Sequence, residues 1–140
     1  MDPIFRLPAN SPLAVTASGD GGLIPLRVPA GWNVIYNQLW VRRLPDGRVR
    51  INDSEDLYWA RTAPPPWLTA EEVAEKGGLR AREITIDAGW YGRHGFRIAV
   101  LDPGWEHERA AHTTADLDEF VATLETWMRM ITVQGKLPES

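Results

Sequence analysis

The chain has 140 residues, of which 44% are hydrophobic and 24% are charged, and its formal net charge is -4 at pH 7. This composition predicts one soluble globular domain and excludes a chain too polar to form a core. The absence of cysteine excludes disulfides, thiolate zinc sites and a cysteine nucleophile. The acidic balance argues against a general nucleic-acid-binding protein and permits a basic partner.

The start of the chain predicts neither export nor membrane insertion. The segment MDPIFRLPANSPLAV lacks the basic start and the continuous apolar stretch of a signal peptide. No run in the sequence approaches the roughly 18 apolar residues of a membrane span. We therefore expect a cytoplasmic protein that begins with an irregular arm over residues 1–22.

A sheet is predicted over residues 23–112. Its first strands are a short edge strand at residues 23–28 and a longer strand at residues 32–41. The apolar parity of the longer strand switches near residues 37–38, which indicates a bulge or a strand buried on both sides. The sequence Pro45-Asp46-Gly47 supplies turn residues, so a hairpin is expected there.

A short surface helix is predicted over residues 69–76. Thr69 as N-cap and Glu72 three residues later form a capping box, and Gly77 and Gly78 end the helix. The helix carries few apolar residues, so we expect it to lie on the surface.

The strongest strand signal is an antiparallel hairpin around a glycine-bearing loop. Apolar residues alternate with other residues over 84–90 and again over 96–100, and the five residues 91–95 join the two runs. Gly92 and Gly95 are expected to supply positive φ in this loop.

A C-terminal helix is predicted over residues 113–133, with Thr113 or Thr114 as N-cap and Gly135 as C-terminal cap. Its apolar stripe consists of Leu117, Phe120, Val121, Leu124, Trp127, Met128 and Ile131. Such a stripe must cover a core. The expected fold is therefore α+β, a four- to five-stranded antiparallel sheet with this helix packed on one face.

The histidines do not form a metal motif. A zinc-protease helix needs histidines four residues apart, whereas His107 and His112 are five apart and would diverge by about 140° on a helix. We expect them in a solvated loop before the helix, and we expect no metal and no cofactor. His94 fits a polar loop residue better than a general base, and no serine lies in a nucleophile elbow.

The tryptophans divide into two groups. Trp32, Trp90 and Trp127 lie on apolar strand or helix positions and are expected in the core. Trp67 and Trp105 lie in loops, where a tryptophan either contacts a partner or packs the loop onto the core. The sequence leaves both alternatives open.

Four segments carry a family resemblance. They are GWNVIYNQLW, EDLYWA, IDAGWYGRHGFRIAVL and a terminal helix ending in LETWM. Over residues 31–131 this order resembles small bacterial immunity proteins of contact-dependent and other polymorphic toxin systems. The resemblance implies a cytosolic, non-enzymatic protein that binds one cognate toxin domain and blocks the active site of that domain.

Partner contacts are expected in loops, where functional residues tend to lie on a rigid scaffold. The candidates are Asp53, Glu55, Asp56, Tyr91, Arg93, His94, Trp105, Glu106 and Glu108. We expect a protein partner and neither nucleic acid nor membrane, and the sequence specifies no oligomeric state. One alternative is a small enzyme or ligand-binding domain with a tryptophan-lined pocket between sheet and helix. Another is a chaperone-like or assembly protein.

Overall fold

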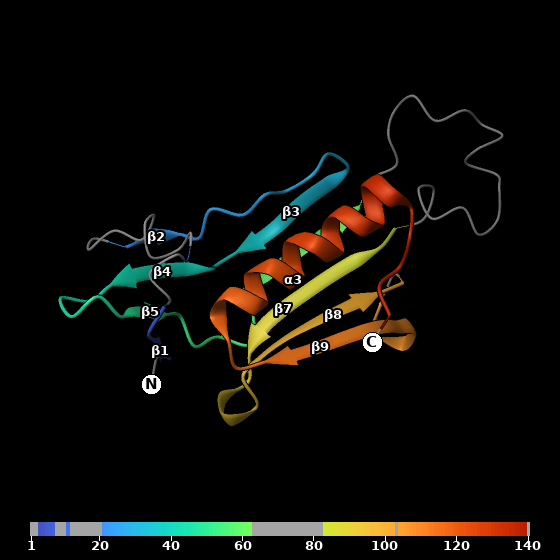
Figure 1. The fold of residues 1–140 in the computed structure, drawn as a ribbon. Coiled ribbons are helices and arrows are strands. Elements are labelled where there is room, and N and C mark those ends of the chain that lie inside the picture. Colours follow the sequence, from blue (N-terminus) through green and yellow to red (C-terminus); the bar gives the residue numbers. More distant parts are fainter. Residues whose placement is uncertain (1–2, 8–10, 12–20, 63–82, 103, 140) are drawn as a thin grey trace, which may run out of the picture.

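The chain folds into two antiparallel sheets and a long C-terminal helix (Figure 1). A computed structural model describes residues 3–7, 11, 21–62, 83–102 and 104–139. The helix predicted over residues 69–76 and Trp67 lie outside these residues. The predicted α+β class is confirmed, although two sheets take the place of the single sheet that we expected.

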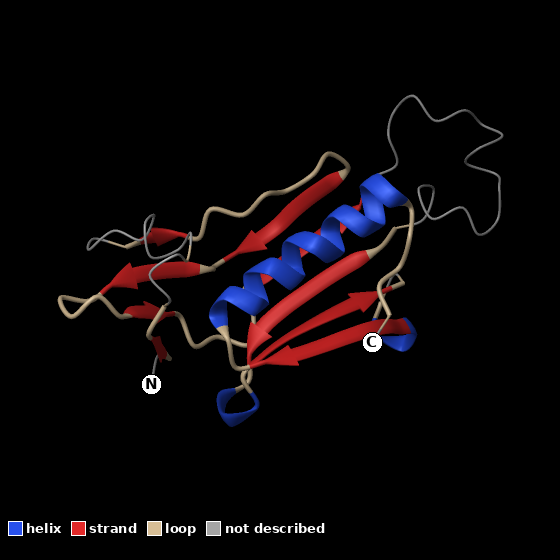
Figure 2. Ribbon diagram, viewed as in Figure 1, coloured by secondary structure: helices blue, strands red, loops and turns tan. Residues whose placement is uncertain are grey.

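The larger sheet has five strands in the spatial order β3, β6, β7, β8, β9. Their bounds are Trp32–Asn37, Tyr58–Thr62, Thr85–Trp90, Phe96–Leu101 and Glu108–Thr114. Helix α3 (Leu117–Arg129) lies across one face of this sheet (Figure 1, Figure 2). We call the opposite face of the five-stranded sheet the open face.

The smaller sheet lies beside the start of α3 and has four short strands. In spatial order they are β1 (Ile4–Phe5), β5 (Val49–Ile51), β4 (Trp40–Arg43) and β2 (Gly22–Leu23). The irregular arm expected over residues 1–22 is corrected at Ile4 and Phe5, which form β1, and the Phe5 ring stacks on Phe96 at 5.5 Å. Residues 1–2, 8–10 and 12–20 of the arm lie outside the described residues. The edge strand expected at residues 23–28 is also shorter than predicted, since Pro25 has no N–H to donate to a sheet.

One bent hairpin runs through both sheets, with the predicted turn at Asp46 and Gly47 confirmed at its tip. Its first arm forms β3 and then β4, and its second arm forms β5 and then β6. The parity switch near residues 37–38 marks the point at which the first arm leaves one sheet for the other. A separate register irregularity lies between Val34 and Tyr36.

Helix α3 buries the predicted stripe against the larger sheet. Leu117, Phe120, Leu124, Trp127 and Met128 are buried. The Phe120 ring stacks on Phe96 of β8 at 4.3 Å, so the interface between helix and sheet is filled by side chains. A π-helical turn, η4 (Met130–Gln134), extends the helix and ends at Gly135 with φ of 67°, as predicted.

The helix starts later than predicted. Thr113 and Thr114 end β9, and Asp116 is the N-cap, with its carboxylate accepting a hydrogen bond from the Glu119 N–H at 3.0 Å. The segment expected as a solvated loop is thus the edge strand β9. In β9 the small residue Ala110 is buried beneath α3, and the polar residues Arg109 and Thr113 are exposed. The strand therefore lacks the alternation of large apolar residues that predicts a strand from sequence.

Candidate functional site

The predicted contact residues lie at opposite ends of the larger sheet. The loop with Asp53, Glu55 and Asp56 and the β7–β8 hairpin tip lie at one end. The connection from β8 to β9, with Trp105 and Glu106, lies at the other. The two ends are separated by the six residues of β8, or roughly 17 Å of extended strand.

The acidic loop, residues 52–56, is anchored to the end of β7 by its backbone. The Ser54 carbonyl accepts a hydrogen bond from the Trp90 N–H at 2.9 Å. At Gly89 the loop comes so close that a Cβ would lie 1.8 Å from the Glu55 carbonyl oxygen. Only glycine fits there, and its lack of a side chain lets the acidic loop lie against the open face.

The hairpin tip contains the two glycines with positive φ that the sequence predicts. Gly92 and Gly95 have φ of 59° and 80°, and the Tyr91 N–H donates to the Gly95 carbonyl at 2.8 Å. Arg93 and His94 form a turn of 3-10 helix, η2 (Gly92–His94), and are exposed to solvent. The tip therefore presents these two side chains outward.

Tyr91 turns out to belong with the acidic loop. Burial raises the pKa of the Tyr91 hydroxyl, and the carboxylates of Asp87, Glu55 and Asp56 raise it further, while Arg97 opposes them. The structure thus brings two predicted residues of the loop together with one of the tip.

At the far end, Trp105 lies in η3 (Trp105–His107) with 56% of its surface exposed. Glu106 beside it is also exposed. Glu108 differs from both, because its carboxylate forms an ion pair with Arg97. Ala99 lies between these two partners on the same face and is only 1% exposed, which fits a salt bridge that crosses above it.

Three residues of the open face escaped the sequence prediction. Tyr36 of β3 pairs with Trp59 of β6, and Trp59 pairs with Asp87 of β7, so the three form one row across the sheet. Tyr36 is 40% exposed and Trp59 is 45% exposed. Strand parity carries the missing signal, since Trp59 alternates with buried Tyr58 and Ala60.

Asp87 is the electrostatically unusual residue of this row. Burial raises the pKa of its carboxyl from 3.8 to about 6, and the nearby Asp56 carboxylate adds to the rise, whereas Arg97 lowers it. The carboxyl group therefore lies where a negative charge is poorly solvated and incompletely balanced.

The arginines of the open face are already engaged. Arg61 bridges to Glu83 at 3.3 Å, and its guanidinium lies 5.7 Å from the centre of the Trp59 ring. Arg97 is paired with Glu108. Within the described residues, neither arginine forms a salt bridge with Asp87, so the surface around this carboxyl group is acidic.

The histidines are dispersed in space. His107 is exposed in η3, whereas His112 belongs to β9, faces α3 and has its ring 6.1 Å from that of Trp127. Its Nε2 lies 3.8 Å from a Glu119 carboxylate oxygen. The described residues contain no group of three or more histidines and carboxylates that could hold a metal ion.

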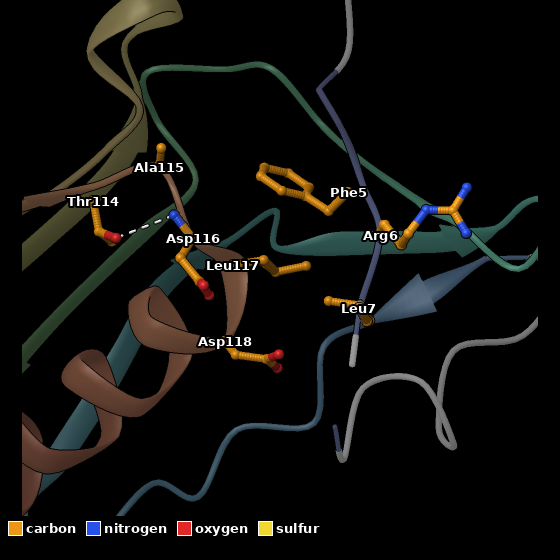
Figure 3. Close-up of a pocket in the computed structure, with 8 residues that line it drawn as sticks. All are labelled: Phe5, Arg6, Leu7, Thr114, Ala115, Asp116, Leu117 and Asp118. Atoms are coloured by element: carbon orange, nitrogen blue, oxygen red, sulfur yellow. Dashed lines mark hydrogen bonds between the residues drawn. The ribbon is translucent and has the colours of Figure 1, made fainter. Parts of the chain in front are cut away.

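Two hollows of about 500 Å³ are lined by described residues, and both lie outside the interface between sheet and helix. The first is an open depression between β1 and the start of α3 (Figure 3). Leu7 and Leu117 face each other across it, while Arg6 points away. The second lies where the bent hairpin passes from one sheet to the other, and Trp40 is the tryptophan among its lining residues. Neither hollow is lined by several tryptophans.

No protein-family model matches the chain, and no curated protein or solved structure matches it. Among the described residues, none of the helices has the length and apolar character needed to cross a bilayer.

Proposed function

We propose that the protein is an immunity protein that binds a cognate bacterial toxin domain in the cytoplasm and blocks the active site of that domain. The observation that carries this proposal is the row of exposed Tyr36 and Trp59 beside Asp87 on the open face. The sequence resemblance over residues 31–131 supports the same function.

The chemistry of the row suits protein binding. Large aromatic side chains supply contact area with few rotatable bonds, and they dominate the energetic centres of protein interfaces. Tyr36 and Trp59 stay exposed, although 21 hydrophobic residues of the described part of the chain are buried in one core cluster. An aromatic pair beside carboxylates offers both apolar contact and charge complementarity to a basic surface.

The loop residues extend this surface. Asp53, Glu55 and Asp56 are exposed next to the row, and their carboxylates would steer a basic toxin toward it. A standard interface buries about 800 Å² on each partner, which corresponds to roughly 30 Å across. Such a contact covers the open face and the hairpin tip, and its rim reaches the far end near Trp105.

The test is co-expression with the toxin domain encoded beside this chain. Wild-type protein should protect cells and should co-purify with the toxin in a one-to-one complex. The double variant Tyr36→Ser with Trp59→Ser should weaken the complex at least 100-fold, because it removes two central anchors of about 1 to 3 kcal/mol each. Val133→Ser is the control and should leave the complex unchanged, since it removes a 54% exposed apolar side chain from η4, which extends α3 on the opposite face of the sheet.

Two results would contradict the proposal. One is the absence of any complex with the neighbouring toxin domain. The other is protection that persists when the protein is present far below one copy per toxin, because such protection requires turnover and would favour the enzyme alternative.

A further inference from the structure

The carboxyl group of Asp87 has a defined chemical setting on the open face. Asp87 and Trp59 are direct cross-strand partners, and side chains in such pairs lie about 5 Å apart on one face. Asp56 lies close enough to raise the pKa of the Asp87 carboxyl. A single incoming group could therefore touch an indole ring and a carboxylate at the same time.

We propose that the surface formed by Trp59, Asp87 and Asp56 receives an arginine side chain that a partner protein presents. In this inference the partner is the toxin of the proposed function, and the docking point lies on the sheet face. The arginine would stack on the exposed indole and form hydrogen bonds to the carboxylate.

Charge complementarity favours a cation here. Arg61 and Arg97 form salt bridges with Glu83 and Glu108, and Arg97 offsets only part of the effects that raise the pKa of Asp87. No salt bridge to Asp56 or Asp87 is formed within the described part of the chain, which leaves two neighbouring negative charges. A partner's cation supplies the missing counter-charge.

Arginine fits this surface better than lysine. Its planar guanidinium stacks on aromatic rings and forms paired hydrogen bonds to a carboxylate, whereas an ammonium is a strongly hydrated point charge. Within the chain, the guanidinium of Arg61 lies 5.7 Å from the centre of the Trp59 ring, a distance typical of a cation–π contact. The exposed surface of the same indole remains accessible to a second guanidinium.

The charged groups around Asp87 determine how binding depends on pH. Asp56 and Glu55 approach from the acidic loop, Tyr91 from the hairpin tip, and Arg97 with its partner Glu108 from β8 and β9. A bound cation favours the ionised carboxylate, so binding releases a proton when Asp87 is protonated beforehand. Affinity should fall about tenfold between pH 7.5 and pH 5, a range that includes the pKa of about 6.

The first experiment needs no toxin. The whole chain is titrated with a capped glycine peptide that carries two arginines, and NMR follows the Trp59 indole N–H and the Asp87 carboxyl carbon. We expect both signals to shift, and we expect tenfold weaker binding when citrulline replaces arginine. Equal binding of the two peptides would overturn the inference, because citrulline keeps the shape and lacks the charge.

Variants then locate the site. Asp87→Asn should weaken peptide binding about tenfold and remove the pH dependence, while Trp59→Leu should weaken binding at any pH. Asp46→Asn removes one negative charge at the tip of the bent hairpin and should change binding less than twofold. Unchanged binding by folded Asp87→Asn would contradict the proposal.

The same variants separate this inference from the proposed function. If the toxin complex forms equally well with Asp87→Asn, the immunity function stands and the arginine site is wrong. If the peptide binds at Asp87 but no toxin complex forms, the arginine site stands and the immunity function is wrong.

Discussion

At the scale of single residues, Gly89 controls the position of the acidic loop. Its missing side chain is the space that the Glu55 carbonyl occupies, and both sides of the contact are backbone. A flexible side chain can swing away from a clash, but the backbone of a sheet and the backbone of an anchored loop cannot. Gly89 therefore couples the position of Glu55 and Asp56 to the sheet.

Gly89→Ala should destabilise the protein by about 2 to 4 kcal/mol, because the added methyl group forces the loop off β7. Urea denaturation measures the loss. Gly22→Ala is the matched control, since a Cβ at Gly22 meets nothing within 4 Å, and it should change stability by less than about 0.5 kcal/mol. Similar losses for the two variants would contradict this account of the loop.

Asp87→Asn should raise the free energy of unfolding at pH 7.5 by about 1 to 2 kcal/mol. This is less than the full shift in pKa implies, because Asp87 is partly exposed and solvent screens its charge. Folding raises the pKa of the Asp87 carboxyl from 3.8 to about 6. The wild-type protein therefore loses stability as pH rises through this range, because the buried group must ionise, whereas the asparagine variant does not.

The advantage of Asp87→Asn should shrink toward zero as pH falls below about 4, where the carboxyl is protonated in both folded and unfolded states. Thermal or urea unfolding at pH 4 and pH 7.5 gives the comparison. A variant that is less stable than wild type at pH 7.5 would show that the Asp87 carboxylate is stabilised in the free protein.

At the scale of elements, periodicity predicts the β7–β8 hairpin and the buried face of α3, because each depends on side chains close together in the sequence. It does not predict β9, whose small and polar residues Ala110 and Thr113 become a strand only by pairing with β8. The same limit explains the wrong N-cap. Thr113 and Asp116 are both residue types that cap helix N-termini, and the length of β9 decides between them.

The candidate site shows a similar division. Charge and loop position identify Glu55, Asp56 and Tyr91 as candidate contact residues, and the structure places these three near one another. Charge and loop position do not reveal that Trp59 and Asp87 join them, because that contact depends on the register between β6 and β7. Register is a long-range property that a single strand does not encode.

The buried helix face gives an element-scale prediction. Leu124→Ala should cost about 2 to 5 kcal/mol, since Leu124 is completely buried on the face of α3 that packs on the sheet and the truncation leaves a cavity. Arg93→Ala at the exposed hairpin tip should change stability by no more than about 0.5 kcal/mol. Urea denaturation of both variants tests the packing, and equal small effects would mean that α3 is not packed as described.

At the scale of the whole molecule, the net charge is -4, and part of the negative charge is concentrated in one place. The acidic loop and Asp87 place negative charge at one end of the open face, so the field should orient an approaching basic partner before contact. Orientation of this kind changes the rate of association more than the lifetime of the complex.

The loop variant Asp53→Asn, Glu55→Gln, Asp56→Asn should therefore slow association with the toxin domain about tenfold at low salt and reduce its salt dependence. Dissociation should change much less. The control variant Asp46→Asn, Glu119→Gln, Glu139→Gln removes the same total charge from exposed sites outside the loop. Stopped-flow kinetics at two salt concentrations measure the association rates. An equal effect of both variants would contradict the prediction, because it would show that only the net charge matters and not the position of the loop.

The contact at Gly89 also has a consequence for how such a protein diversifies. The loop is held by the hydrogen bond from the Trp90 N–H to the Ser54 carbonyl and by the close approach of the Glu55 backbone to Gly89, and neither contact uses the side chains at positions 55 and 56. These two positions can exchange acidic, polar or basic residues while the scaffold that displays them stays the same. A change of partner then requires only point substitutions in the loop, with no refolding of the sheet beneath it.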